Sequence, residues 1–417
     1  MSENDYNLTC GQRWQISRSA RPVQRIYRLS ESFDSSAFLP ALRSVIARHP
    51  ALRIQLIQTE KGWRQRFPDQ GVEYSEVQIR GITRTYRSIY AELLLEEERK
   101  RTLDLRCEPP VKTKVLKVNG VYWLSLCVDH ISADQIGFDL FERELLYAYQ
   151  QTLNGLAITS KPSESFINYI TKEVSDRHKV ENSNLLYWQD QLKSLPMREL
   201  SYIKKSLVSV STFNFEIGGK DFYSFMIFCK SMKCSAFHII VATQLLLLAG
   251  VRGINDIILN IPISNRLLPV EQSIIGNLAM LLHVRFFITQ NEPIHEFLIR
   301  IRNKIFTAMT HRQYSYTSLM RNVNLEAQGE GVKPSFPIIC NFVTESARID
   351  YPNILFESRM DNQSRAVRNI YRSNFWVNAR QYKSKLGIRI DWDADTWPIS
   401  IDEMNLKYLA FFKKFIE

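Results

Sequence analysis

The sequence predicts an α/β protein of two domains or two lobes. At 417 residues the chain is too long for one small hydrophobic core. In both halves, segments with the two-residue period of strands alternate with segments that have the 3.6-residue period of helices. The clearest break in this pattern lies between Ser194 and Val210, where one predicted helix ends and a new series of elements begins.

The first half is predicted to combine hairpins with amphipathic helices. Asn119 and Gly120 form a tight turn between two strands, because both residues adopt positive φ angles readily. Residues 121–128 alternate and then turn continuously apolar, as a strand does on entering a core. The predicted elements are a strand at 25–29, a helix at 35–48, a hairpin of 51–58 and 63–67, a helix at 89–102, a hairpin of 111–118 and 121–128, a helix that runs to about residue 151, and helices at 166–178 and 183–193.

The second half repeats this style of strand and helix. Residues 235–250 are apolar on nearly all sides, which is typical of a buried helix. The other predicted elements are strands at 213–217, 256–263 and 281–288, a helix at 294–311, strands at 337–343, 373–378 and 385–391, and an amphipathic helix at 401–415.

The composition is that of a folded protein with an anionic partner. Hydrophobic residues make up 45% and aromatic residues 12% of the chain, which excludes a disordered protein. The formal net charge is +11. Nucleic acid is not favoured, because neither a recognition motif nor basic residues interleaved with aromatic ones occur. An acidic protein or a phosphate-bearing group fits the charge.

The sequence is expected to be that of a cytoplasmic protein, because it shows neither a membrane span nor a secretory signal. The longest apolar run, 237–251, is interrupted by His238, Thr243 and Gln244, so no membrane span is predicted. The first residues, MSENDYNLTCGQRW, lack the basic region and apolar run of a secretory signal. The six cysteines form no CxxC pair and no metal-ligand spacing, so neither a disulfide framework nor a metal site is predicted.

A polar cluster lies where a predicted strand meets a predicted helix. In the stretch LCVDHISADQIGFDLF, Asp129, His130 and Asp134 follow the strand and precede an apolar pattern at helical spacing. The exit of a strand is a place where side chains reach a cleft without disturbing a core. His130 is therefore a candidate catalytic residue, and a histidine that only satisfies the turn is the alternative.

Residues 129–135, DHISADQ, resemble the HHxxxDG signature of the condensation domains of nonribosomal peptide synthetases. That family belongs to the chloramphenicol-acetyltransferase-like acyltransferases. Other segments resemble further motifs of the family in the expected order: LTCGQRW at 8–14, RHPALR within 33–56, the pair Tyr187 and Trp188 with Leu192, the residues 264–266 that end on Arg266, the run Ile275, Gly276 and Asn277 before Arg285, and HRQYSYTSLM at 311–320.

The resemblance implies an architecture and a set of partners. It implies two chloramphenicol-acetyltransferase-like lobes, 1–182 and 183–417, each with a mixed sheet, that form a V with a tunnel at their interface. It implies that a carrier protein delivers an acyl or peptidyl group on its phosphopantetheine arm, while the acceptor enters from the other side. No cofactor is expected to be bound otherwise, and the habit of the family favours a monomer. The positive charge agrees with an acidic carrier protein.

The same resemblance assigns roles to single residues. His130 is expected to act as a general base or to position the acceptor. Asp134 is expected to cap the helix because of its position at the helix start, and the resemblance implies that it also pairs with Arg266. Asp129 replaces the first histidine of the signature, and its charge would raise the pKa of His130. Gln135 replaces the glycine, and it either narrows the tunnel or contacts the substrate.

Asn341 and Tyr314 are possible tunnel residues, although ordinary structural roles are favoured for both. No serine nucleophile elbow, P-loop or dinucleotide fingerprint occurs.

The leading hypothesis is a free-standing condensation enzyme that makes an amide or an ester. A coenzyme A-dependent acyltransferase of the same fold is the first alternative, although the DFGWG element of the plant enzymes is lacking. A catalytically silent module that recruits partners is the second alternative.

Overall fold

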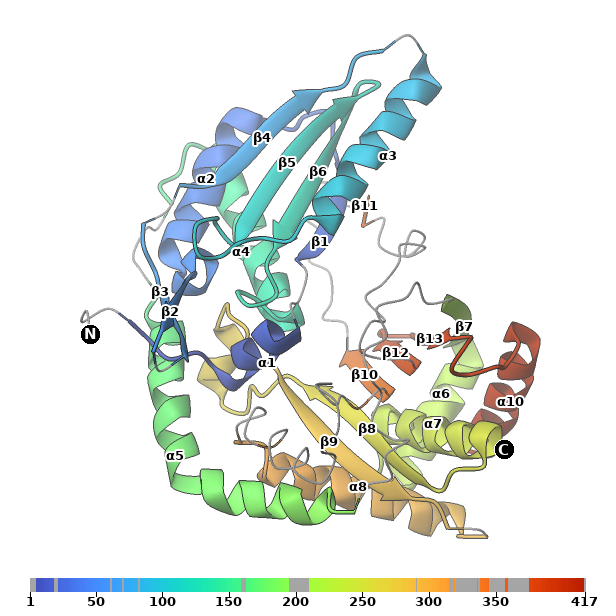
Figure 1. Ribbon diagram of the computed structural model, residues 1–417. Coiled ribbons are helices and arrows are strands. Elements are labelled where there is room, and N and C mark those ends of the chain that lie inside the picture. The colour runs from blue at the N-terminus through green and yellow to red at the C-terminus, as the bar shows by residue number, and fades with distance from the viewer. Residues whose placement is uncertain are drawn as a thin grey trace. The chain divides into compact units, whose positions relative to one another are not determined.

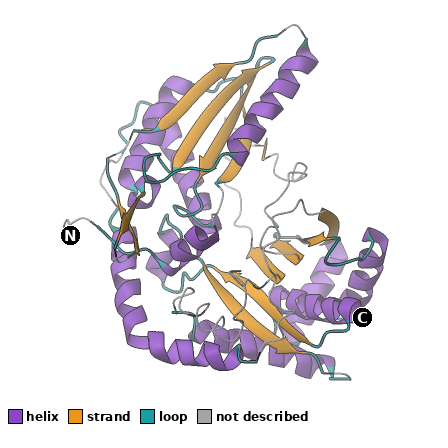
Figure 2. Ribbon diagram, in the orientation of Figure 1, coloured by secondary structure: helices purple, strands orange, loops and turns teal. Residues whose placement is uncertain are grey.

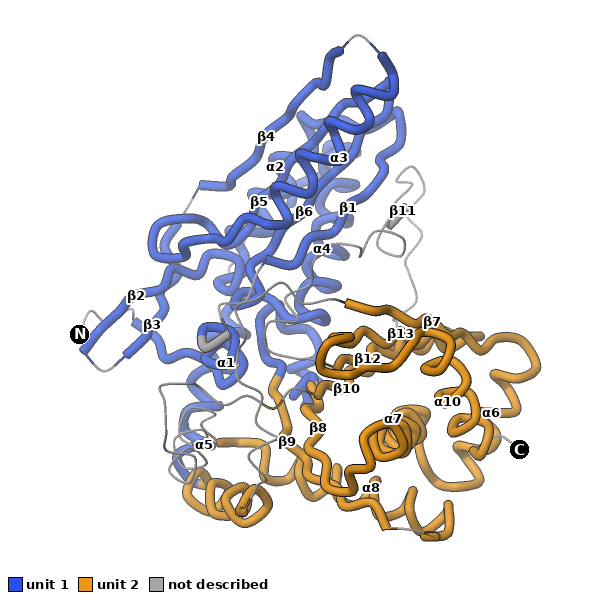
Figure 3. Tube along the Cα trace, turned by 45° about the vertical axis from the view of Figure 1, so that its right-hand side comes forward, with its two compact units in different colours: residues 1–179, 264–279, 349–366 blue, residues 180–263, 280–348, 367–417 orange. Residues whose placement is uncertain are grey.

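The computed structural model divides into two compact units (Figure 3). Unit 1 comprises residues 1–179, 264–279 and 349–366, and unit 2 comprises 180–263, 280–348 and 367–417. The lobe boundary at residue 182, the V and the tunnel stay predictions. The structure describes residues 5–18, 22–60, 62–69, 71–81, 83–158, 163–194, 210–289, 291–314, 319, 336, 338–344, 357–358 and 375–415.

Unit 1 is built on a mixed sheet of five strands (Figure 1). The spatial order is β11-β1-β6-β5-β4. The pair β4 and β5 is parallel, whereas the other neighbours are antiparallel. The strands are β1 (Val23–Leu29), β4 (Glu73–Gln78), β5 (Val111–Val118), β6 (Val121–Val128) and β11 (Glu357–Ser358).

Helices cover both faces of this sheet (Figure 2). The helices α2 (Ser35–Arg48) and α4 (Gln135–Leu153) pack on the face to which Val115 points. The helix α3 (Arg84–Lys100) packs on the opposite face, to which Leu116 points. Successive side chains of a strand point to opposite faces, so β5 and β6 contribute to two apolar clusters and are fixed in register by both.

A third apolar cluster of unit 1 lies beside the sheet. It joins residues of the segment 264–279, such as Leu278, to Leu8 and Phe166. The elements here are α1 (Cys10–Arg18), the 3-10 helix η1 (Pro50–Arg53), the hairpin β2 (Gln55–Thr59) and β3 (Gly62–Arg66), and the first part of α5 (Ser165–Gln191). The segment 264–279 is therefore part of this core, although it connects two strands of unit 2.

Unit 2 has a mixed sheet of six strands in the order β7-β13-β12-β10-β8-β9. The pairs β12 with β10 and β10 with β8 are parallel. The strands are β7 (Val210–Gly218), β8 (Asp256–Ile263), β9 (Met280–Phe287), β10 (Ile338–Thr344), β12 (Phe375–Gln381) and β13 (Lys385–Asp393). With unit 1, this sheet confirms the predicted α/β class with mixed sheets.

The helix α7 (Ala236–Arg252) is the centre of the core of unit 2. It contacts β10 and β12 as well as the helices α6 (Gly219–Ser231), α8 (Ile294–Thr310) and α10 (Ile401–Lys413). An apolar helix of this kind is buried on nearly all sides, as its composition predicts. Among the described residues no single helix has the length and apolar composition to cross a membrane, and α6 and α7 meet those criteria only as a pair bent by 93°.

Most predicted elements are confirmed, and three predictions are wrong. The first hairpin strand begins at Gln55, because Pro50 starts a 3-10 turn. The helix predicted at 89–102 begins at Arg84, where Thr83 caps it. The two helices predicted at 166–178 and 183–193 form one helix, α5, since neither glycine nor proline interrupts the sequence between them. The predicted break at 194–210 and the end of the 311–320 motif lie largely outside the described residues.

Candidate functional site

A tight loop between β6 and α4 carries the residues of the DHISAD stretch. The carboxylate of Asp129 accepts a hydrogen bond from the backbone N–H of Ile131 at 2.9 Å. The carbonyl of Asp129 accepts from the N–H groups of Ser132 at 2.9 Å and Ala133 at 3.3 Å. These bonds form a tight turn directly after β6, and His130 is the second residue of this turn.

The ring of His130 has a defined orientation. It is half-buried, and its Nδ1 lies 3.1 Å from the carbonyl oxygen of Ala133. A carbonyl oxygen only accepts hydrogen bonds, so Nδ1 carries a proton in this contact. In the neutral ring the lone pair is therefore on Nε2. This is the arrangement that a general base needs, because Nε2 is then the nitrogen that accepts a proton.

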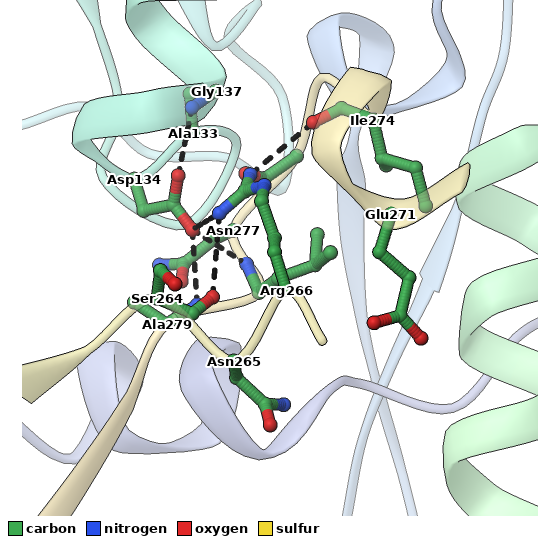
Figure 4. A network of polar contacts seen from close by, with 12 residues as sticks. Ala133, Asp134, Gly137, Ser264, Asn265, Arg266, Glu271, Ile274, Asn277 and Ala279 are labelled. Carbon is green, nitrogen blue, oxygen red and sulfur yellow. Dashed lines mark hydrogen bonds and ion pairs between the residues drawn. The ribbon is translucent and has the colours of Figure 1, made fainter. Parts of the chain in front are cut away.

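Asp134 joins the loop to the helix and to the segment 264–279 (Figure 4). Its Oδ1 accepts from the N–H of Gly137 at 2.8 Å, which caps α4 as predicted. Its Oδ2 accepts from Nη1 of Arg266 at 2.7 Å and from the N–H groups of Leu278 and Ala279 at 2.9 and 3.0 Å. One buried carboxylate thus receives four hydrogen bonds, three of them from the segment 264–279.

Arg266 also bonds the backbone of its own segment, 264–279. Its Nη2 donates to the carbonyl oxygens of Ile274 and Gly276, each at 3.2 Å. Its side chain is 0% exposed and that of Asp134 is 5% exposed. The pair that the resemblance implies is therefore present, within unit 1, and it is buried. Its role as active-site support stays a prediction.

Gly137 and Gly276 allow the segment 264–279 to pack closely against α4 and α5. A Cβ atom on Gly137 would lie 2.5 Å from the carbonyl oxygen of Gly276. A Cβ atom on Gly276 would lie 2.5 Å from the ring of Phe166. Both distances are shorter than any ordinary contact, so glycine at these positions is a packing requirement of the site rather than a requirement of the backbone angles.

Gly137→Ala is expected to destabilise the protein, although alanine normally favours a helix. Helix propensity alone would stabilise this change by about 0.8–1 kcal/mol. The new methyl group meets a backbone carbonyl, and overpacking of this kind costs about 1–3 kcal/mol. The free energy of unfolding, measured in urea, is expected to fall. Gly71→Ala is the control, since nothing lies within 4 Å of its Cβ position, and a larger loss there than at Gly137 would contradict the account.

Asp129 lies in a less favourable environment than Asp134. It is buried, with 3% of the residue exposed, and among the described residues the N–H of Ile131 is the one donor to its carboxylate. Burial raises the pKa of Asp129 to about 6, and the bond from Ile131 opposes this shift. Asp129 is thus charged at neutral pH and neutral in mild acid, so the negative charge beside His130 depends on pH.

Asp129→Asn is expected to change how stability depends on pH. Between the pKa of an unfolded aspartate, about 3.9, and about 6, the folded protein binds more protons than the unfolded one. The contribution of Asp129 to stability is therefore present below pH 4 and is lost as the pH rises to 6. Relative to wild type, Asp129→Asn should gain about 2–3 kcal/mol between pH 4 and pH 7. A constant difference in unfolding free energy across this range would contradict the assignment.

The three predicted tunnel residues have local partners. Gln135 donates from Nε2 to the carboxylate of Asp139, one turn along α4, at 2.9 Å. Asn341 on β10 donates to the side chain of Asn378 on β12 at 3.1 Å. Tyr314 is 2% exposed, and its hydroxyl donates to the carbonyl of Leu281 at 2.8 Å. These contacts agree with the structural interpretation that was favoured for Asn341 and Tyr314, while a place in a tunnel stays a prediction.

The motif residues of unit 2 meet around His311. The ring of Tyr187 stacks on that of His311 with 4.0 Å between their centroids. The indole N–H of Trp188 donates to the carbonyl of His311 at 2.7 Å. These three residues come from the two motifs at 187–192 and 311–320, so the structure brings together segments that the sequence shows far apart.

Sequence reasoning gave no role to Gln12 or Asn277, although both belong to the quoted motifs. Gln12 donates to the carbonyl of Ile131, and Asn277 donates to the carbonyl of His130. The helix that carries Gln12 was also missed. Thr9 and Gln12 have the spacing of a capping box, with reciprocal bonds of 2.9 and 3.1 Å, and that pattern would have predicted a helix from Cys10.

Comparison with known proteins supplies a family. The protein-family model of the condensation domain matches residues 2–410 of this chain. Cyclosporin synthetase of Tolypocladium inflatum is 24% identical over 330 residues, which is 76% of this chain. The N-(5-amino-5-carboxypentanoyl)-L-cysteinyl-D-valine synthase of Penicillium rubens is 22% identical over 401 residues, 91% of this chain. The chain spans 2% and 10% of the length of these two relatives.

Solved structures share the fold at low identity. The X-domain from teicoplanin biosynthesis has a TM-score of 0.78 at 16% identity, and the match covers 100% of this chain and 95% of that one. The first condensation domain of the calcium-dependent antibiotic synthetase has a TM-score of 0.73 at 14% identity, covering 99% and 96%. The epimerization domain from the third module of tyrocidine synthetase B has a TM-score of 0.73 at 13% identity, covering 99% and 97%.

Proposed function

The chain belongs to the condensation domain family, and from this premise we propose that it transfers an acyl or peptidyl group from a carrier-protein thioester to an amine or a hydroxyl acceptor. The observation that carries the proposal is the orientation of His130. Its Nδ1–H is held by the Ala133 carbonyl, which leaves the lone pair of the neutral ring on Nε2.

In the proposed reaction, His130 first takes a proton from the acceptor and later returns it to the released thiolate. The nitrogen or oxygen of the acceptor attacks the thioester carbonyl, and its proton moves to Nε2. The tetrahedral intermediate then breaks its C–S bond, and the released thiolate of the phosphopantetheine arm takes the proton from the imidazolium. A hydroxyl acceptor needs this assistance more than an amine does. Assistance by a general base contributes about 10²- to 10⁴-fold in rate.

The charge of the chain supports a carrier protein as the donor. The formal net charge of +11 favours acidic partners and the phosphate of a phosphopantetheine arm. In this proposal the arm is part of the donor, so the chain itself needs no resident cofactor. The acceptor is either a small molecule or a second carrier-bound group.

Two other candidates share the fold. A coenzyme A thioester is the alternative donor, and the starter condensation domain of rhizomide synthetase has been solved in complex with C8-CoA. A recruitment module without catalysis is the other candidate. The replacements Asp129 and Gln135 in the signature favour it, whereas the oriented ring of His130 opposes it.

The test supplies the chain alone with an acyl-loaded carrier protein and a panel of amine and alcohol acceptors, with the carrier followed by intact mass. Loss of the acyl group that requires both the chain and an acceptor supports the proposal. Faster transfer from acyl-coenzyme A than from the carrier would establish the alternative donor. Binding of the carrier without turnover for any acceptor would establish the recruitment module.

A further inference from the structure

Two side-chain amides from distant parts of the chain hold successive carbonyl groups of the DHISAD loop. Nδ2 of Asn277 donates to the carbonyl of His130 at 2.5 Å. Nε2 of Gln12 donates to the carbonyl of Ile131 at 3.2 Å. Asn277 and Gln12 are both 0% exposed, and all these residues lie within unit 1. The peptide groups that follow the His130 side chain are therefore fixed from two sides.

The amide of Gln12 uses all four of its hydrogen-bonding positions. Its Oε1 accepts from the N–H of Thr9 and from Nε2 of Gln65, each at 2.9 Å. Its Nε2 donates to Oε1 of Gln65 at 2.9 Å and to the carbonyl of Ile131. A buried amide that satisfies two donor and two acceptor positions has a single orientation, because a flip would place like groups together.

Asn277 is anchored by the same helix start and by the ion-pair segment. Its carbonyl accepts from the hydroxyl of Thr9 at 3.0 Å. The next residue along the segment, Leu278, donates its N–H to Asp134. A Cβ atom on Gly11 would lie 2.7 Å from Oδ1 of Asn277 and 2.2 Å from the carbonyl oxygen of Ala279. Two residues of the TCGQ run therefore support Asn277, Thr9 by a hydrogen bond and Gly11 by leaving room for its side chain.

From this arrangement we propose that Asn277 and Gln12 are positioning residues for His130. The ψ angle of His130 sets the direction of its carbonyl, and Asn277 holds that carbonyl. Gln12 holds the next one, so the backbone between His130 and Ala133 keeps the geometry in which Nδ1 reaches the Ala133 oxygen. Neither amide touches a reacting atom in this scheme. The inference rests on the proposed function, in which Nε2 of His130 takes the proton.

The test reads the tautomer of His130 by NMR of protein labelled with ¹⁵N-histidine, with His130→Ala used to assign the signals. Wild type is expected to show a neutral ring protonated on Nδ1. In Asn277→Ala the signals should move toward a mixture of tautomers. The transfer rate should fall about 10²-fold with little change in KM, as for a displaced catalytic group. Gln12→Ala should act in the same direction.

Asn184→Ala is the matched control, because Asn184 is also buried and donates to a backbone carbonyl, that of Gln313, in unit 2. In this variant the tautomer signal of His130 should equal that of wild type at a similar loss of stability, while the signal of His311, whose Nδ1 lies 3.0 Å from Oδ1 of Asn184, should change. If Asn277→Ala does not fold, Asn277→Leu removes the same donor at nearly the same size without burying a charge, and it should give the same change. An unchanged tautomer signal in folded Asn277 variants would overturn the inference. A wild type with the Nδ1–H tautomer that transfers no acyl group would instead overturn the proposed function alone.

Discussion

Asp134→Ala is expected to lower the free energy of unfolding by about 3–5 kcal/mol, because it leaves Arg266 buried without its carboxylate. The change also removes the acceptor of the N–H groups of Leu278 and Ala279 and the cap of α4. A loss of this size is a large part of the stability of an ordinary domain. Unfolding in guanidinium chloride, followed by circular dichroism, measures it.

A double-mutant cycle separates the ion pair from the cap. Arg266→Ala alone should cost nearly as much as Asp134→Ala, and the double variant should cost clearly less than the sum. Asp176→Ala is the control, since Asp176 forms an exposed i,i+4 pair with Lys172, and such pairs contribute about 0.3–0.5 kcal/mol. Additive losses at Asp134 and Arg266, or a loss no larger than at Asp176, would show that the pair does not hold the site together.

His130→Ala is expected to reduce acyl transfer about 10²- to 10⁴-fold without unfolding the protein. The ring is half-buried, so its loss removes less packing than the loss of a core side chain. The rate is measured by intact mass of the carrier under single turnover. His295→Ala is the control, because that side chain is 62% exposed on α8, and equal rates for both variants would exclude His130 from the reaction.

For elements with strong local patterns, the sequence predicted the first and last residues correctly. The helix α2 has both its apolar spacing and Asp34 as its cap, and the hairpin β5–β6 has alternation on both sides of the Asn119–Gly120 turn. In that turn both residues have positive φ angles, 52° and 83°, as the sequence requires. Local chemistry alone determines such boundaries, so no long-range contact was needed to predict them.

Elements that depend on distant partners were missed. The helix α1 has little apolar periodicity, because its buried side chains include the polar ones of Gln12, which bonds within the core, and Gln15. The strand β4 is half-exposed at the end of the sheet order and shows weak alternation. The segment 264–279 reads as a connection between strands, yet it belongs to unit 1 through the bonds of Arg266 and Asn277.

The main residues of the candidate site were predicted through the resemblance to a family. The residues that hold them in place were not predicted. His130, Asp134 and Arg266 stand in recognisable motifs, so their partnership could be stated in advance. The roles of Gln12, Asn277 and the packing glycines follow from contacts between residues more than a hundred positions apart. No periodicity or spacing encodes such contacts, because an amide that bonds a carbonyl in another segment leaves no local pattern.

The most direct test of the central claim is the dependence on pH of single-turnover transfer to a hydroxyl acceptor, which does not itself titrate near neutrality. If neutral His130 is the base, the rate falls in acid with one protonation. The fall of the rate in acid should persist in Asp129→Asn, because His130 is intact in that variant. It should be absent from the residual rate of His130→Ala. A fall of the rate in acid that remains in His130→Ala, or that disappears in Asp129→Asn, would contradict the claim that the proton moves to His130.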